Sequence, residues 1–146
     1  MDIKRLPTVI AQQNQPYAKG TAAFGTRGFV FLSGSVGINT TDGVIPGSIA
    51  EQTKLALTNI KQRLEEFGSS LEYILHEWVY LKGSFPNGIV NESMWQQCSN
   101  ALEEFWRENC PSFLMGNIPP ARTLLGVTSL ARAEFKVEIQ VIAAVP

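Results

Sequence analysis

The sequence has few of the residues that build metal sites and disulfide frameworks. It contains 2 cysteines, Cys98 and Cys110, and a single histidine, His76. Zinc sites need several clustered Cys or His ligands, and disulfide-stapled domains carry dense cysteine pairs. We therefore expect two reduced thiols that pack as small hydrophobic groups, no metal site and no Cys–His nucleophile pair.

An excess of basic charge and long apolar runs are also missing. The chain has 12 Lys and Arg against 13 Asp and Glu, and its pI is about 5.8. Nucleic acids and anionic membranes are bound through cationic contacts, so neither is an expected partner. No apolar run approaches the roughly 20 residues of a spanning helix, and the first residues lack a signal peptide's apolar run. These absences predict a soluble, cytoplasmic protein whose partner is a small molecule or another protein.

The sequence does contain the pattern of one α+β domain, residues 1–146. A helix is expected after Ser48, which forms a capping box with Glu51, and Gly68 marks its end. A second amphipathic helix is expected over residues 94–107. Strands are expected at 28–32, in the second half of 71–81, at 122–130 and at 135–145, the last with alternating apolar and polar residues. This order predicts two helices packed on one mixed sheet.

Several short motifs occur in a recognisable order. PPART at residues 119–123 is followed by an apolar strand and then by VEIQVIA at 137–143. Three further segments agree in order and spacing: PYAKG at 16–20, FLSG at 31–34, and the helix carrying QT at 52–53 and NIK at 59–61. Together these motifs span nearly the whole chain. They resemble the Rid/YjgF family of reactive-intermediate deaminases, also called endoribonuclease L-PSP proteins.

The resemblance implies a fold, an assembly and an activity. The fold is a chorismate-mutase-like α+β subunit, and the assembly is a homotrimer whose sheets form a central barrel with clefts between neighbouring subunits. The activity of the deaminase branch is hydrolysis of reactive enamines and imines, such as 2-aminoacrylate, to a 2-keto acid and ammonia. The substrate is small and carries a carboxylate, and neither a metal nor an organic cofactor takes part.

The family motifs assign roles to five residues. Arg122 would bind the substrate carboxylate, because a planar guanidinium offers two charge-assisted hydrogen bonds. Glu138 would activate or position the hydrolytic water. Tyr17 and Ser33 would line the pocket and orient substrate or water, and Gly34 would let the backbone approach the ligand closely.

The sequence departs from the family pattern at two places. Leu124 stands where many deaminases carry cysteine, which excludes thiol chemistry there but leaves its backbone able to contact a carboxylate. The segment 87–118 is longer than in compact members. It adds apolar residues that either cover the cleft and admit a bulkier substrate, such as 2-aminomuconate, or extend the core or the trimer contact: Met94, Trp95, Phe113, Leu114 and Met115.

Four functional interpretations remain open from the sequence, and the fourth is a pathway-specific role in degradation or biosynthesis through the same imine hydrolysis on a larger substrate. The first is an enamine/imine deaminase. The second is a non-catalytic ligand-binding or regulatory trimer of the same fold, which Leu124 and the altered connector would suit. RNA cleavage is the third, and the acidic pI argues against it. His76 matches no catalytic position of the family and is expected to be structural or exposed.

Overall fold

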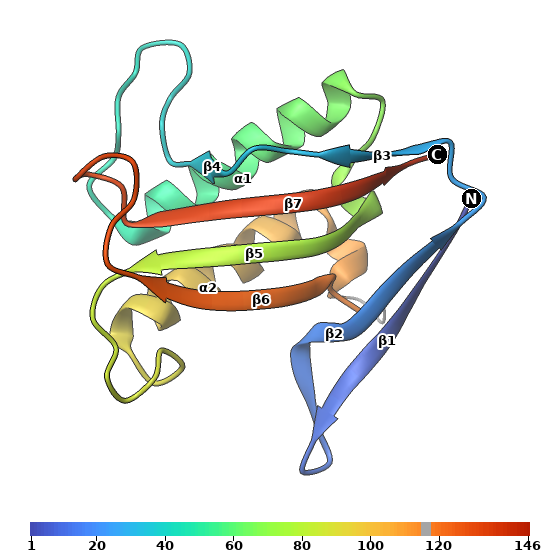
Figure 1. The fold of residues 1–146 in the computed structure, drawn as a ribbon, viewed down its shortest axis with the longest axis horizontal. Coiled ribbons are helices and arrows are strands. Elements are labelled where there is room, and N and C mark those ends of the chain that lie inside the picture. The colour runs from blue at the N-terminus through green and yellow to red at the C-terminus, as the bar shows by residue number, and fades with distance from the viewer. Residues whose placement is uncertain (115–117) are drawn as a thin grey trace.

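A computed structural model of the chain describes residues 1–114 and 118–146. Within these residues, two α-helices cover one face of a mixed sheet (Figure 1). The sheet order is β1-β2-β6-β5-β7-β3, and β4 also pairs with β7. The predicted α+β architecture is therefore confirmed. Its strands are β1 (Asp2–Ile10), β2 (Gln13–Phe24), β3 (Gly28–Phe31), β4 (Ser35–Val36), β5 (Ile74–Lys82), β6 (Ala121–Val127) and β7 (Val137–Val145).

The helices begin and end where the local sequence predicts. Helix α1 (Ile49–Glu66) starts after Ser48, whose Oγ accepts a hydrogen bond from the Glu51 N–H at 3.1 Å. Gly68 has a φ of +72°, which favours glycine just past a helix end. Helix α2 (Ser93–Asn109) follows Glu92, whose side chain makes no capping hydrogen bond. Two short 3₁₀ turns, η1 (Leu71–Tyr73) and η2 (Pro111–Phe113), precede β5 and follow α2.

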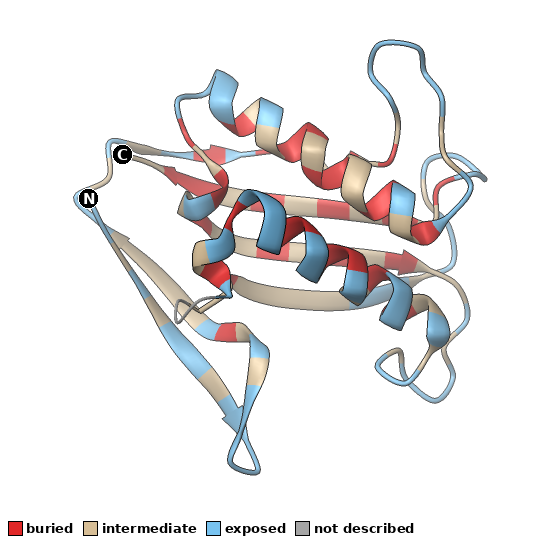
Figure 2. Ribbon diagram, turned by 180° about the vertical axis from the view of Figure 1, so that it is seen from behind, coloured by how far each residue is buried: buried red, intermediate tan, exposed pale blue. Residues whose placement is uncertain are grey.

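The hydrophobic core lies between the helices and the sheet. Figure 2 shows buried residues on the inner sides of both helices and on alternate positions of the central strands. Val79 and Leu81 of β5 and Ile139 and Val141 of β7 are fully buried there. The alternation of β7 thus matches its sequence pattern. The opposite side of the sheet, here called the open face, is covered by no helix of the described residues (Figure 1).

The register of the central strands brings two charged residues side by side. Strand β5 runs parallel to β6 and antiparallel to β7, and α2 lies in the crossover between β5 and β6. In this register Glu77 of β5 is paired with Arg122 of β6. Strand β6 ends at Val127, short of the predicted residue 130, because its partner β5 ends at Lys82 in the same register.

An N-terminal hairpin of β1 and β2, which the sequence patterns did not predict, extends away from the sheet (Figure 1). It joins β6 where Ala18 is paired with Ala121. The Ala18 N–H donates to the Pro120 carbonyl at 3.2 Å, and the Ala121 N–H donates to Thr21 Oγ1 at 3.4 Å. The hairpin therefore brings Tyr17 close to the start of β6.

Both cysteines and part of the long segment 87–118 lie in the core. Cys98 and Cys110 are both free thiols and both buried, as predicted. Phe113 is buried in the core, whereas Met115 lies outside the described residues. No helix in the described part of the chain is long and apolar enough to cross a membrane.

Candidate functional site

Arg122 lies on the helix side of the sheet and is paired with a buried carboxylate. Its Nε donates to Glu77 Oε1 at 2.6 Å, and its Nη2 lies 2.6 Å from the same oxygen. The Arg122 side chain is only 7% exposed and that of Glu77 is fully buried. Glu77 Oε2 has no hydrogen-bond partner among the described residues. The carboxylate therefore fixes one edge of the guanidinium group.

The guanidinium borders a cavity of about 400 Å³, here called the Arg122 cavity. Its other lining residues are uncharged and mostly apolar: Gln15, Pro16, Tyr17, Val90, Trp95 and Leu124. The Trp95 ring lies 5.9 Å from the Arg122 guanidinium carbon, a distance at which a cation and an aromatic face attract each other. An arginine at the wall of an apolar cavity can bind a small anion with an apolar substituent.

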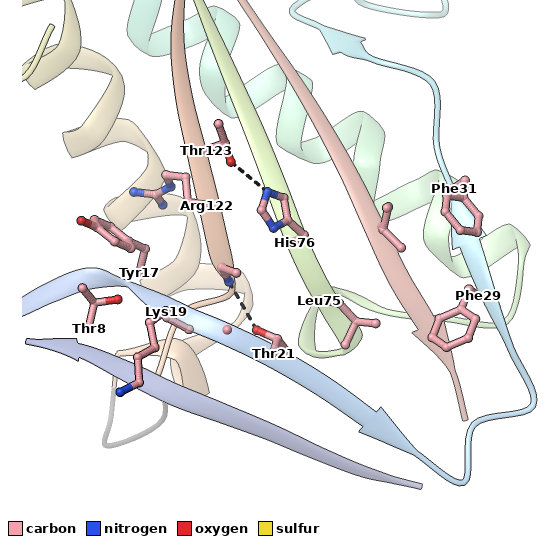
Figure 3. Close-up of a pocket in the computed structure, with 14 residues that line it drawn as sticks. Thr8, Tyr17, Lys19, Thr21, Phe29, Phe31, Leu75, His76, Arg122 and Thr123 are labelled. Carbon is pink, nitrogen blue, oxygen red and sulfur yellow. Dashed lines mark hydrogen bonds between the residues drawn. The ribbon is translucent and has the colours of Figure 1, made fainter. Parts of the chain in front are cut away.

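Tyr17 and Arg122, which the family motifs assign to the site, lie near one another. Both border the Arg122 cavity and a second, larger hollow of about 760 Å³ on the other side of β6. Figure 3 shows the Arg122 side chain extending toward the side on which Tyr17 lies and away from His76 and Thr123. The phenol comes from the hairpin and the guanidinium from β6, so their proximity depends on the hairpin's contact with the sheet.

Glu138, Ser33 and Gly34 lie elsewhere in the single chain. Glu138 alternates with the buried Val137 and Ile139, so its side chain is on the open face. A Cβ atom at Gly34 would come within 2.7 Å of the Glu138 carboxylate, so a larger residue there would displace this side chain. Ser33 is exposed beside it. One subunit therefore places the predicted site residues in two groups on opposite faces of the sheet, Arg122 and Tyr17 in one and Glu138, Ser33 and Gly34 in the other.

The departures from the family pattern also have places in the structure. Leu124 borders the Arg122 cavity and packs against the core. Within the long segment 87–118, Val90 and Trp95 line that cavity, whereas Phe113 extends the core. Leu114 borders a smaller hollow that also touches Arg122. Of the apolar additions, Trp95 therefore lies at the Arg122 cavity and Phe113 in the core.

His76 is half-buried on the open face and contacts other side chains. Its Nε2 lies 3.2 Å from Thr123 Oγ1, and its ring lies 4.0 Å from the ring of Trp78. Burial lowers the pKa of His76, opposed by the negative charge of Glu77. This shift favours the neutral form of the ring.

Cys98 lies on the buried side of α2, beside Thr53 of α1 and near the charged pair. Thr53 Oγ1 donates to its sulfur at 3.5 Å. Burial raises the pKa of Cys98 to about 11, a shift opposed by the Thr53 hydrogen bond and by the positive charge of Arg122. The thiol is therefore protonated at neutral pH and is not a nucleophile. In residues 1–114 and 118–146, no three His, Cys, Asp or Glu side chains are grouped as metal ligands would be.

Two residues of this site were not assigned a role from the sequence. Glu77 lies in none of the family motifs, and Trp95 is only one of several apolar additions in the segment 87–118. A signal for Glu77 does exist, because it is in phase with the buried Val79 and Leu81 along β5. A carboxylate at an inward-facing position requires a buried cation, and Arg122 supplies it.

Comparisons with known proteins agree with the motifs. The family model described as endoribonuclease L-PSP matches residues 10–145. The chain belongs to this family. The 2-iminobutanoate/2-iminopropanoate deaminase of Escherichia coli K12 is 28% identical over 136 residues, which covers 92% of this chain and 94% of that protein. A RutC family protein of Pyrococcus horikoshii is 30% identical over 138 residues, covering 92% and 95%.

Solved structures show the same Rid/YjgF fold. The Rid family protein YyfB of Yersinia pestis superposes with a TM-score of 0.71 at 18% identity and covers 99% of this chain and 100% of its own. Escherichia coli TdcF, solved with bound serine, has a TM-score of 0.66 at 25% identity and covers 97% and 94%. The Rid/YjgF fold therefore accounts for the two helices on a mixed sheet.

Proposed function

We propose that this Rid/YjgF protein is an enamine/imine deaminase that hydrolyses a small carboxylated substrate to a 2-keto acid and ammonia. The observation that carries the proposal is the buried Arg122, which borders an apolar cavity of about 400 Å³ together with Tyr17. The names of the E. coli relatives, 2-iminobutanoate/2-iminopropanoate deaminase, support the reaction class at low identity. The carboxylate of the substrate would bind at Arg122.

The reaction needs water and several proton transfers. Protonation of an enamine at its terminal carbon gives an iminium ion. Glu138 then takes a proton from water as the oxygen bonds to the iminium carbon, and returns that proton to the nitrogen of the resulting carbinolamine. As the C–N bond breaks, ammonia leaves, the hydroxyl group gives its proton to the Glu138 carboxylate, and the keto acid forms; the proton on Glu138 then passes to solvent. General acid–base groups of this kind contribute roughly 10²–10⁴-fold to a rate.

We further propose that two subunits complete each site. Arg122 and Glu138 are on opposite faces of the sheet, so a carboxylate-binding group and a water-activating group from one chain do not face one cavity. A homotrimer in which the Arg122 and Tyr17 side of one subunit adjoins the Glu138 side of its neighbour would bring the two groups into one cavity. The exposed aromatic residues Phe29 and Phe31 on the open face are consistent with such a contact.

The experiment follows imine hydrolysis directly. 2-Iminobutanoate is generated in situ by an amino-acid oxidase, and semicarbazide traps the free imine while the keto acid and ammonia that the protein forms are measured. We expect Arg122→Lys to raise KM and Glu138→Gln to lower kcat by about 10²-fold or more. Undiminished turnover in both variants would refute the proposal.

A second function is favoured by one observation, the Leu124 side chain at the cavity where many family members carry cysteine. In this reading the protein binds keto acids in the Arg122 cavity and regulates another process without turnover. The same assay separates the two functions. Tight keto-acid binding, with no hydrolysis of any imine tested, would identify the ligand-binding trimer.

A further inference from the structure

The carboxylate of Glu77 determines which part of Arg122 is left for a ligand. Oε1 lies 2.6 Å from both Nε and Nη2, so Glu77 occupies the side edge of the guanidinium group. Among the described residues, Nη1 donates to no protein acceptor, so the end of the group remains available. A ligand carboxylate can therefore approach Arg122 at its end but not along the Nε edge.

Glu77 also cancels the charge that a ligand meets. Arg122 is the one charged residue among the described residues that line the Arg122 cavity. Its partner Glu77 is fully buried, so solvent screens the negative charge little. A ligand with one carboxylate brings one further negative charge to a neutral pair. A dicarboxylate brings two, and the described lining offers no second cation to receive the other.

We propose that Glu77 is a positioning and specificity-determining residue that restricts this site to monocarboxylates with an apolar substituent. The proposal rests on the proposed function, in which Arg122 binds the substrate carboxylate. It separates the two substrate types that the sequence left open. A 2-aminoacrylate-like monocarboxylate matches the site, whereas a 2-aminomuconate-like dicarboxylate does not, although the apolar walls of Trp95 and Leu124 could contact its carbon chain.

The test compares two ligands of equal chain length by isothermal titration calorimetry on the full-length assembled protein. 2-Oxopentanoate has one carboxylate, and 2-oxopentanedioate carries a second at the far end. We expect the wild-type protein to bind 2-oxopentanoate at least about tenfold more tightly, because like charges repel strongly where solvent is excluded. Equal affinities, or a preference for the dicarboxylate, would overturn the proposal.

Two variants at position 77 separate charge from position. Glu77→Gln keeps the size and an acceptor oxygen but removes the negative charge, so it should tighten binding of both ligands and reduce their affinity ratio to about threefold or less. Glu77→Asp keeps the charge but shortens the reach to Nε, so it should weaken both ligands and preserve the ratio. If Glu77 had only a structural role, both variants would contain a smaller fraction of protein able to bind ligand. The affinity of the remaining folded protein for each ligand, and the ratio of the two affinities, would then be unaltered in both variants.

The controls make each outcome decisive. Glu66→Gln removes one charge at an exposed end of α1 and should keep the wild-type ratio. A folded Glu77→Gln variant with the wild-type ratio refutes the proposal, and so does a wild-type protein that binds neither keto acid. If Glu77→Gln does not fold, the wild-type ratio and the Glu77→Asp variant decide. Selective keto-acid binding without imine hydrolysis would refute the proposed function and leave this proposal standing.

Discussion

Glu77 and Arg122 form a charged pair that is almost entirely withdrawn from water. Desolvation of two buried charges costs several kcal/mol, and their attraction compensates for it only with good geometry and further hydrogen bonds. Here Oε2 of Glu77 has no hydrogen-bond partner in the described part of the chain. The pair is therefore expected to add little net stability, and its retention is better explained by the fixed orientation that it gives to Arg122.

Removal of Arg122 alone should destabilise the protein strongly. Arg122→Ala leaves the carboxylate of Glu77 buried without its cation, and the expected loss is about 3–5 kcal/mol in the free energy of unfolding. Arg122→Ala combined with Glu77→Gln removes the orphaned charge and should recover most of that loss. Urea denaturation of both variants measures the difference. A loss below about 1 kcal/mol in the single variant, typical of a surface pair, would show that water reaches Glu77.

The buried thiol of Cys98 should make stability fall at alkaline pH. Burial raises the pKa of the Cys98 thiol from its ordinary 9.0 to about 11, so above pH 9 the unfolded chain loses this proton before the folded chain does. Deprotonation then favours the unfolded state until the pH passes the pKa of Cys98 in the folded chain. The free energy of unfolding should fall by roughly 2–3 kcal/mol over this range.

The measurement is urea unfolding of the wild type and of Cys98→Ala at pH 8 and pH 10.5. The alanine variant corrects for the tyrosines and lysines that titrate in the same range. We expect the wild type to lose more stability than the variant over this interval. Parallel losses in the two proteins would show that Cys98 ionises in the folded state.

At the level of single side chains, part of the candidate site could be predicted from the sequence. The motif resemblance identified Arg122 and Tyr17, which border the same cavity, and Glu138 and Gly34, which contact one another. It did not identify Glu77, since a charge within an apolar strand reads as a break in the pattern. Only the register between β5 and β6 shows that this charge lies beside Arg122.

Among the elements, α1 owes its start to Ser48. The hydroxyl accepts the Glu51 N–H, which satisfies one of the free donors of the first turn. Ser48→Ala should therefore lower the free energy of unfolding by about 1 kcal/mol. Ser93→Ala is the matched control, because this exposed serine begins α2 without being its capping residue, and its loss should stay within about 0.5 kcal/mol. Equal losses in urea denaturation would contradict the capping role.

The predictability of each element depended on how local its determinants are. Helix α1 carries its cap, its apolar face and its terminal glycine within the sequence of the helix, and β7 shows its alternation directly. The end of β6 depends on where β5 stops, which no pattern within β6 reveals. The hairpin of β1 and β2 was missed because most of its residues are exposed or half-buried, so no regular apolar face marks it.

For the molecule as a whole, we expect assembly through the open face. Phe31 is 73% exposed and Phe29 is 52% exposed there, an unfavourable state for two aromatic rings in a monomer. Phe31→Glu should convert a trimer of 16.1 kDa chains to monomers and reduce imine hydrolysis by about tenfold or more. Light scattering coupled to size-exclusion chromatography measures the mass.

Phe67→Glu provides the control for that experiment. Phe67 is also an exposed aromatic residue, 62% exposed, but it lies at the C-terminal end of α1 on the helix side of the molecule. The variant should keep the wild-type mass and activity. A trimer that survives Phe31→Glu, or one that is lost in Phe67→Glu, would place the subunit contact elsewhere.

The attachment of the N-terminal hairpin has a thermodynamic consequence. Ala18 is paired with Ala121. Tyr17 directly precedes Ala18 in β2, and Arg122 directly follows Ala121 in β6. Ligand affinity and hairpin docking are therefore linked: a ligand that touches both side chains favours the docked hairpin, and a subunit that stabilises the docked hairpin raises affinity by the same factor. Through this junction, occupancy of the cavity and association of the chains become mutually reinforcing.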